Sequence, residues 1–125
     1  MHLNEISGQI VDAAMAVHTA LGPGLLESAY QTCLAFELRS RGLHVETEHG
    51  LPLVYRGEQM DVGYRVDLLV NSQIIVEVKS VDRLAPIHEA QLLSYLKLAD
   101  LRLGLLINFN VLRLKDGIKR MANGV

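Results

Sequence analysis

The first third of the chain follows the spacing of helices. Apolar residues recur every three or four positions from Ile6 to Leu21, which describes one buried stripe on a first helix. Gly22-Pro23-Gly24 ends this helix, and helical spacing resumes from Leu25 to Arg41. Gly42 stands where a left-handed C-terminal cap belongs. The pattern therefore predicts two consecutive helices joined by a short glycine-rich loop.

The middle of the chain changes to the spacing of strands. Apolar and polar residues alternate from Leu43 to Glu48, which is typical of a strand with one wet face. A short strand is predicted at Leu53–Tyr55, followed by a turn over Arg56–Gln59. β-Branched residues are frequent in Tyr64–Val70 and Ile74–Val81, and the short polar stretch between these runs predicts a tight hairpin. We expect these runs to form the middle of a sheet.

The last third predicts a helix between strands. Pro86 suits the first turn of a helix that continues to Leu98. Leu103–Phe109 is almost unbroken in its apolar character, as a strand covered on both faces would be. The tail, residues 111–125, holds one more short apolar alternation and an Asp116-Gly117 turn. The order α-α-β-β-β-α-β predicts an α/β fold with a mixed central sheet flanked by helices.

Composition limits the class of protein. The chain has 125 residues, of which 50% are hydrophobic and 21% charged, and this predicts one compact domain spanning residues 1–125. The start of the chain has no basic stretch followed by an apolar one, and no apolar run approaches the roughly 20 residues of a membrane span. We therefore expect an intracellular, cytoplasmic protein that does not enter a membrane. The formal net charge of −2 is unlike that of a general nucleic-acid binder, so such binding would be local or metal-assisted.

Three charged residues stand where the strand pattern calls for apolar ones. Asp67 interrupts the apolar run Arg65–Val70. Glu77 and Lys79 share one face of the run Ile74–Ser80, because side chains two positions apart in a strand point the same way. Burying a charge costs free energy unless it is paired or bound to a metal. The three residues are therefore candidates for chemistry.

The register of the predicted hairpin decides whether the two acids meet. Asp67 faces Glu77 across an antiparallel pair only if Val70 faces Ile74. The loop must then be the three residues Asn71-Ser72-Gln73. A two-residue loop would send the carboxylates to opposite faces unless a bulge intervened. The three-residue loop is thus a condition for a shared site.

Two facing carboxylates beside an ammonium group suggest a metal site. Neighbouring carboxylates repel each other, and Mg²⁺ or Mn²⁺ relieves the repulsion through oxygen ligands and retained waters. Lys79 would then lie within reach of a metal-bound water or of charge developing on a phosphate. The alternative is a plain salt bridge from Lys79 to one of the acids. For an isolated Glu-x-Lys tripeptide that alternative is favoured, because such tripeptides are common by chance.

Two helices add polar residues to the candidate set. Glu27 lies in the first turn of the second helix, where the helix dipole alone would favour a carboxylate. On the third helix, His88, Gln91 and Tyr95 follow one another at helical spacing and form a polar seam. A solvated face explains His88 well, but it explains Gln91 and Tyr95 less well because leucines flank them.

The residues together resemble a known family. Gly24-Leu25-Leu26-Glu27-Ser28-Ala29-Tyr30 is similar to the signature of the GxxExxY proteins, a group within the PD-(D/E)XK nuclease-like superfamily. The likeness extends over nearly the whole chain, through Asp67 and the triplet Glu77-Val78-Lys79. It continues through Gln91-Leu92-Leu93-Ser94-Tyr95, similar to the QxxxY helix of RecB-like nucleases, to Leu106-Ile107-Asn108-Phe109. A departure is that Asp67 follows a valine and not the proline of the superfamily's name, at a position that varies widely.

The resemblance implies a restriction-endonuclease-like core in a single domain and a bound Mg²⁺ or Mn²⁺. The implied metal ligands are Glu27, Asp67, Glu77 and the backbone carbonyl of Val78. The implied catalytic residues are Lys79, Gln91 and Tyr95. Lys79 would orient or activate the attacking water, while the two helix residues would position Lys79, the water or the scissile phosphate. Glu27 would be a further ligand or an acid behind the ligands.

These features lead to a first hypothesis, metal-dependent hydrolysis of phosphodiester bonds in nucleic acid, with DNA ranked ahead of RNA. The small size, the acidic balance and the low aromatic content count against it, so we expect a homodimer or a larger protein partner to complete the nucleic-acid surface. The best local basic patch consists of Arg113, Lys115, Lys119 and Arg120, which an ordinary solvated face explains equally well.

Two other hypotheses belong to different classes. The second is a non-catalytic binding or regulatory module that keeps the nuclease-like scaffold and acts with a partner protein. The third makes Cys33 a redox or catalytic nucleophile with His18 or His44. A small buried residue is the favoured interpretation of Cys33, which lies in the middle of a predicted helix. His18 could reach the same cleft as Glu27, but a packed or capping role is favoured.

Overall fold

The computed structural model describes residues 2–124 as a five-stranded sheet with helices against it. In chain order the elements are α1 (Leu3–Leu21), α2 (Glu27–Ser40), β1 (Val45–Tyr55), β2 (Glu58–Val70), β3 (Ile74–Lys79), α3 (Pro86–Ala99), β4 (Leu103–Asn108), the 3₁₀ helix η1 (Leu114–Gly117) and β5 (Ile118–Ala122). The predicted α/β class and the order α-α-β-β-β-α-β are confirmed. The short apolar alternation predicted in the tail forms β5.

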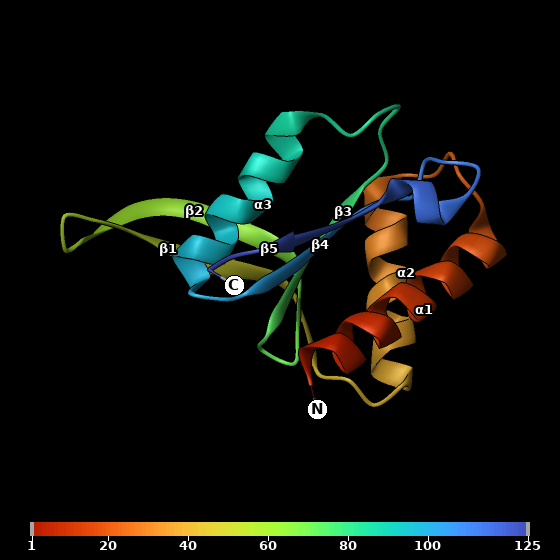
Figure 1. The fold of residues 1–125 in the computed structure, drawn as a ribbon, viewed down its shortest axis with the longest axis horizontal. Coiled ribbons are helices and arrows are strands. Elements are labelled where there is room, and N and C mark those ends of the chain that lie inside the picture. Colours follow the sequence, from red (N-terminus) through yellow and green to blue (C-terminus); the bar gives the residue numbers. More distant parts are fainter. Residues whose placement is uncertain (1, 125) are drawn as a thin grey trace.

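The helices enclose the sheet from both sides (Figure 1). The strands lie in the order β1-β2-β3-β4-β5, with β3 and β4 parallel and the other neighbours antiparallel. One apolar cluster joins α1 and α2 to one face of the sheet, and a second joins α3 to the other. Because α3 connects β3 to β4 across a face, the two strands run in the same direction and both end at one edge of the sheet.

The faces of the central strands agree with the predicted periodicity. Val76 and Val78 belong to the cluster under α1 and α2, so Glu77 and Lys79 point towards the side of α3. All six residues of β4 are buried, as expected of a strand covered on both faces. No helix among residues 2–124 has both the length and the apolar character needed to cross a membrane.

The β2–β3 hairpin has the register that a shared carboxylate site requires. Val70 lies opposite Ile74, so the loop is the predicted Asn71-Ser72-Gln73. Asn71 and Ser72 adopt positive φ angles of 51° and 54°. The amide of Asn71 also donates to the carbonyl of His44 over 2.8 Å, which ties this loop to the start of β1.

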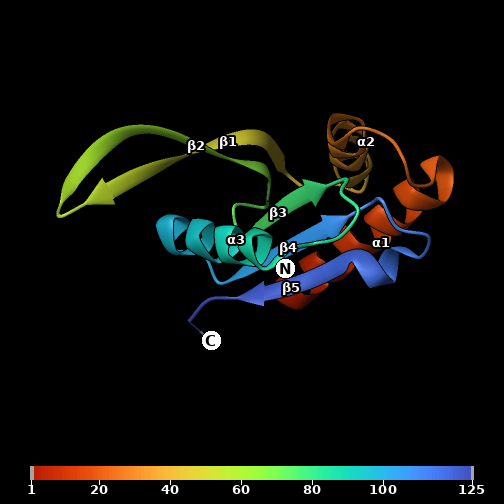
Figure 2. The same cartoon turned by 90° about the horizontal axis from the view of Figure 1, so that it is seen from above.

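The β1–β2 hairpin is longer than predicted. β1 continues through Pro52, which an edge strand tolerates because a proline N–H is not needed there, and a register shift separates Leu51 from Leu53. The predicted turn over Arg56–Gln59 is wrong in extent, because Glu58 already pairs with Tyr55. This hairpin reaches out beyond the rest of the sheet (Figure 2). Its outer half is exposed on both faces, so no apolar alternation marked it in the sequence.

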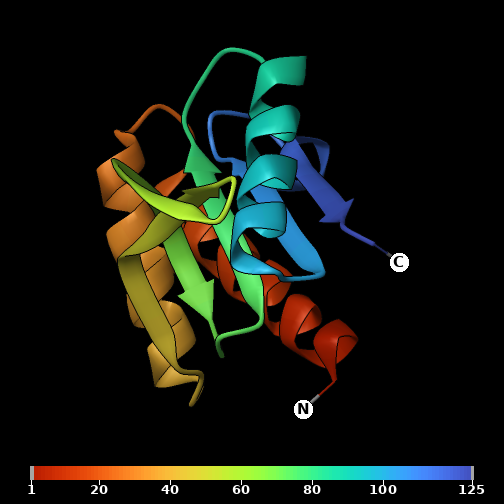
Figure 3. The same ribbon diagram turned by 90° about the vertical axis from the view of Figure 1, so that its left-hand side faces the viewer.

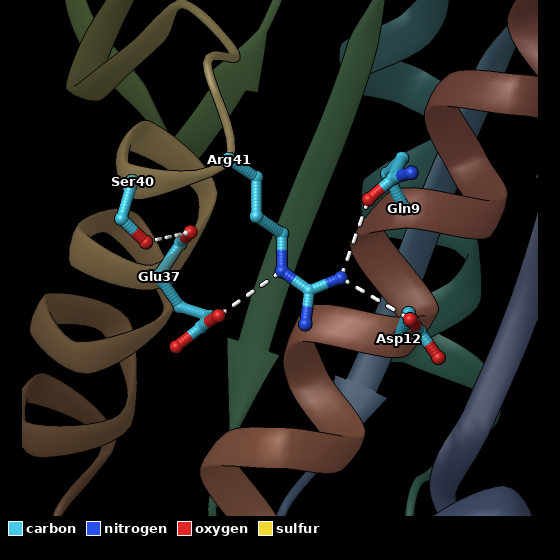
Figure 4. A network of polar contacts seen from close by, with 5 residues as sticks. All are labelled: Gln9, Asp12, Glu37, Ser40 and Arg41. Atoms are coloured by element: carbon cyan, nitrogen blue, oxygen red, sulfur yellow. Dashed lines mark hydrogen bonds and ion pairs between the residues drawn. The ribbon is translucent and has the colours of Figure 1, made fainter.

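A polar network ties the end of α2 to α1 on the surface (Figure 4). The Arg41 guanidinium donates to Glu37 over 3.0 Å, and to Asp12 and Gln9 over 3.2 Å each. Gly42 follows with φ 85°, which is the predicted left-handed cap. The network therefore joins the C-terminal end of α2 to α1 at the surface.

Candidate functional site

The two acids predicted to meet across the β2–β3 hairpin do meet. The backbone N–H of Asp67 donates to Oε2 of Glu77 over 2.7 Å, and the backbone N–H of Val78 donates to Oδ2 of Asp67 over 2.8 Å. The paired backbone ladder stops at Leu68 and Val76, and the carboxylates accept the next amides instead. Each acid is therefore fixed by the opposite strand.

Burial makes it costly for both acids to be charged. Removal from water, with the negative charge of Asp67 as the next cause, raises the pKa of Glu77 from its ordinary 4.5 to about 8. Burial also raises the pKa of Asp67, although the Val78 amide and the charge of Lys79 act in the opposite direction. The pair therefore favours any cation that lets both acids ionise.

Lys79 acts on both acids without forming an ion pair. Its positive charge lowers the pKa of Asp67 and of Glu77, so it lies near both. Within residues 2–124, however, the ion pairs shorter than 4 Å join Arg41 to two acids and His49 to Glu46, and none includes Lys79. The plain salt bridge considered for Lys79 is not formed there. Its ammonium group thus remains available to another partner beside the carboxylates.

Glu27 lies at the start of α2 and reaches the segment that follows Lys79. Its Oε2 accepts from the backbone N–H of Ser80 over 3.2 Å, and the hydroxyl of Ser80 donates to the carbonyl of Leu25 over 2.6 Å. The negative charge of Glu27 raises the pKa of Asp67, so this acid lies on the side of the carboxylate pair. The first turn of α2 is therefore joined to the end of β3.

Tyr30 holds the loop that presents Glu27. Its buried hydroxyl donates to the carbonyl of Gly22 and accepts from the backbone N–H of Leu25 over 3.1 Å. Its ring stacks on Phe109 with 4.6 Å between centroids. The spacing of the Gly24, Glu27 and Tyr30 signature thus has a physical basis, since the tyrosine fastens the loop from which the glutamate extends.

Replacing Tyr30 by Phe should loosen this loop while keeping the stacked ring. We expect the free energy of unfolding to fall by about 1–3 kcal/mol, because the Leu25 amide loses its partner. The backbone N–H of Ser80 donates to Glu27, and its hydrogen should exchange with solvent faster. Urea unfolding and amide hydrogen exchange measure the two effects. Tyr55→Phe is the matched control, since Tyr55 is 57% exposed on the hairpin; equal effects of the two changes would contradict the role of Tyr30.

Tyr95 and Gln91 approach the carboxylates from α3. Burial raises the pKa of the Tyr95 phenol, and the negative charges of Glu77 and Asp67 raise it further. A hydrogen bond with Gln91 lowers the same pKa, so the two helix residues act together. His88 does not join them, because its Nδ1 accepts from the backbone N–H of Ala85 over 3.0 Å and caps the helix.

Comparison with known proteins agrees with this geometry. Residues 4–121 match the family model of the PD-(D/E)XK nuclease superfamily. The chain belongs to this superfamily. It is also similar to the crystal structure of SSO0001, with a TM-score of 0.60 and 21% identity over 78% of this chain and 50% of that one. This likeness concerns the fold, and the chain spans half the length of SSO0001. No curated protein sequence matches it.

The PD-(D/E)XK assignment raises the question of whether the site suits a divalent cation. Within residues 2–124, no three His, Cys, Asp or Glu side chains form a ready-made metal cage. Mg²⁺ does not need one, because it is commonly held by one or two carboxylates and keeps several waters. The hydrogen bonds use Oδ2 of Asp67 and Oε2 of Glu77, which leaves the other oxygen of each acid. In the same range no fully buried side-chain oxygen lacks a partner, so these two oxygens keep some contact with solvent. The donor set fits Mg²⁺ or Mn²⁺.

A further acid near the Asp67–Glu77 pair was not predicted as a site residue. On β1, Thr47 pairs with Leu68 and His49 pairs with Val66. Glu48 lies between them and therefore stands opposite Asp67. Its charge raises the pKa of both Asp67 and Glu77. Glu48 has a φ of 51°, and its Oε1 accepts from Gln31 over 2.8 Å. The sequence placed it only on the wet face of a strand, and its unusual backbone angle left no signal in the pattern.

Asn108 was also missed as a positioning residue. It is 1% exposed, at the end of β4 opposite Lys79. Its side chain accepts from the backbone N–H of Val81 over 3.1 Å and donates to the carbonyl of the same residue over 2.9 Å. A buried polar residue in an apolar strand was the signal that singled out the acids, and the same signal was present at Asn108.

The residues behind the third hypothesis have packing contacts. Nε2 of His18 lies 2.8 Å from the carbonyl oxygen of Val111, and its ring lies near Phe109. Cys33 is half-buried and packs against the core on the side of α1 and α2. The basic residues of the tail are all exposed: Arg113, Lys115, Lys119 and Arg120. The structure thus brings together the residues of the first hypothesis and gives His18 the favoured packed role.

Proposed function

We propose that this chain is a metal-dependent nuclease that hydrolyses phosphodiester bonds of nucleic acid, with DNA as the first substrate to test and RNA as the second. The observation that carries the proposal is the pair of crossed hydrogen bonds that fixes Asp67 and Glu77 face to face. Beside them lies Lys79, which forms no ion pair within residues 2–124. Membership of the PD-(D/E)XK nuclease superfamily supports it. The narrower GxxExxY assignment, carried by Gly24, Glu27 and Tyr30, belongs to the same proposal.

Each residue of the site has a role in this proposal. Asp67, Glu77 and the backbone carbonyl of Val78 hold Mg²⁺ or Mn²⁺, with Glu27 as a further ligand or an acid behind the ligands. Such a cation supplies charge stabilisation to the phosphate and lowers the pKa of a water. Lys79 orients that water and stabilises negative charge on the phosphate oxygens.

The helix residues act on the same reaction from the other side. Gln91 and Tyr95 position Lys79, the water or the scissile phosphate, and their place on α3 beside Glu77 supports this. Phosphates must also be attracted to a site with several acids. The exposed tail residues Arg113 and Lys115 follow the end of β4, at the sheet edge where Lys79 also lies, and would supply part of the positive charge. A second copy or a larger protein partner would supply the rest.

A cleavage panel tests the proposal. Single-stranded, linear, nicked and branched DNA and RNA are incubated with the protein and Mg²⁺ or Mn²⁺. We expect cleavage of at least one substrate, and a loss of at least about a hundredfold in Lys79→Ala, because a positioned charge at the reacting phosphate contributes that much. Glu58→Ala, at the hairpin tip, is the matched control and should retain activity. Cleavage retained by Lys79→Ala, or no cleavage of any substrate, would contradict the proposal.

A non-catalytic binding or regulatory module acting with a partner protein is the second candidate. The lack of three converging metal-ligating side chains in residues 2–124 favours it. Titration of Mn²⁺ into the wild type, Asp67→Ala and Glu77→Ala separates the two candidates. The nuclease requires binding in the wild type and weaker binding in both variants. Equal titration curves for the three proteins would favour the second candidate.

A further inference from the structure

A cavity of about 500 Å³ lies between the β1–β2 hairpin and α3. The two elements lie side by side, with the hairpin reaching past the helix (Figures 2 and 3). The lining includes Leu53 and Tyr64 from the hairpin and Gln91 and Tyr95 from α3. The proposed function uses Gln91 and Tyr95 but gives no role to the hollow they face.

The cavity and the carboxylate site adjoin at Tyr95. Tyr95 belongs to both, since it lines the cavity and feels the charges of Glu77 and Asp67. Tyr64 lies three residues before Asp67 on β2, about 10 Å along the strand. A phosphate held at the carboxylates would therefore have its neighbouring nucleotide at the mouth of this cavity.

The lining has the chemistry that recognises a nucleobase. The ring of Tyr64 is partly exposed and lies 5.9 Å from that of Tyr95 at an angle of 54°. Aliphatic side chains form much of the remaining wall, while the amide of Gln91 and the hydroxyl of Ser94 offer hydrogen bonds to a base edge. Lys97 adds a positive charge at the same cavity, opposite in sign to a phosphate. An aromatic ring with a cation and a few polar groups suits a stacked base next to its phosphate.

We propose that this cavity holds an unpaired base of the substrate strand, stacked on Tyr64, while the adjacent phosphate lies at the carboxylates. The inference rests on the proposed nuclease function and names its substrate class. Bases of an intact duplex are stacked and paired inside the helix and cannot enter a side cavity. The preferred substrate is then single-stranded nucleic acid, or a duplex with unpaired nucleotides beside the cut.

Binding of labelled single-stranded DNA tests the inference without relying on cleavage. Lys79→Ala serves as the background, so that the strand stays intact while both carboxylates remain. In the presence of Mg²⁺, fluorescence anisotropy should show a Kd that rises about tenfold or more when Tyr64→Ala is added, and that changes little with Tyr64→Phe. Tyr55→Ala, an exposed tyrosine nearer the hairpin tip, is the matched control and should leave the Kd unchanged.

Single abasic sites moved along the strand provide a second measurement, whose main effect is read on the protein with Tyr64 intact. One position should weaken binding to the protein with Tyr64 intact, and Tyr64→Ala should remove the effect of that position alone. An equal loss of affinity at every abasic position would overturn the inference. Equal affinity for single-stranded and fully paired DNA, with and without Tyr64, would overturn it too. Absence of cleavage in the panel together with a position-specific Tyr64 effect would instead overturn only the proposed chemistry.

Discussion

Glu77→Gln should stabilise the metal-free protein at alkaline pH, although it removes a proposed metal ligand. The pKa of Glu77 is raised to about 8 by burial and by the charge of Asp67. Between pH 4.5 and 8 the folded carboxyl keeps a proton that the unfolded chain has released, so the stability it contributes is lost as the pH rises. Glutamine carries no charge, and its amide oxygen can still accept from the backbone N–H of Asp67.

Urea unfolding in EDTA from pH 5 to pH 9 measures this effect. The free energy of unfolding of the wild type, relative to the variant, should fall with rising pH by at most about 1.4 kcal/mol per pH unit. Glu58→Gln, an exposed acid at the hairpin tip, is the control and should follow the wild type. A difference between wild type and Glu77→Gln that stays constant from pH 5 to pH 9 would show that Glu77 is not buried as described.

Metal addition should reverse the order of stability, so that the wild type becomes more stable than Glu77→Gln. Mn²⁺ should raise the melting temperature of the wild type more at pH 8 than at pH 6, because ionisation of the pair no longer competes with folding once a cation is bound. Glu77→Gln should show little shift at either pH. Glu77→Gln would then stabilise the metal-free protein and also remove metal binding. This result would show that Glu77 serves metal binding at a cost to folding stability.

The carboxylate site was predictable because the sheet restricts the alternatives. Apolar residues on both sides of Asp67 and Glu77 specify which faces of β2 and β3 are buried, and a shift of one residue would turn both strands over. Without a bulge, a three-residue loop is needed to bring the acids together, and the structure has this loop at Asn71-Ser72-Gln73. The two acids within apolar strands therefore tied the expected register to a shared site.

The exposed hairpin and the residues attached to it were not predictable in the same way. The outer halves of β1 and β2 are wet on both faces, so their sequence has no period from which to infer Glu58–Met60 as a strand. Glu48 reaches the site through a backbone angle that L residues seldom adopt. The four tyrosines of the sequence indicated few stacking surfaces, yet the fold places Tyr64 and Tyr95 at one cavity.

The segment that follows Lys79 is held by hydrogen bonds from Asn108 of β4, and we call these bonds the Asn108 clamp. β3 ends at Lys79, and the chain then leaves the sheet through Ser80 and Val81. Asn108 bonds both the N–H and the carbonyl of Val81, and the N–H of Phe109 donates to the carbonyl of Lys79 over 2.9 Å. The position of the ammonium group beside the carboxylates is therefore set largely from β4.

Asn108→Ala should accordingly damage both stability and the site. It leaves the backbone N–H of Val81 without its partner and removes the shorter of two hydrogen bonds to the Val81 carbonyl, so we expect the free energy of unfolding to fall by about 2–3 kcal/mol. Cleavage should fall too, through displacement of Lys79, while Mn²⁺ still binds because Asp67 and Glu77 are held by β2 and β3. Urea unfolding, the cleavage panel and Mn²⁺ titration measure the three quantities.

Asn110→Ala is the matched control for this clamp. Its amide donates to the same carbonyl of Val81 over a longer 3.3 Å and it is only half-buried, so we expect a loss below about 1 kcal/mol. Equal losses in the two variants would mean that the segment after β3 does not depend on Asn108. A variant of Asn108 that lost Mn²⁺ binding along with cleavage would mean that β4 positions the carboxylates themselves, and not the lysine alone.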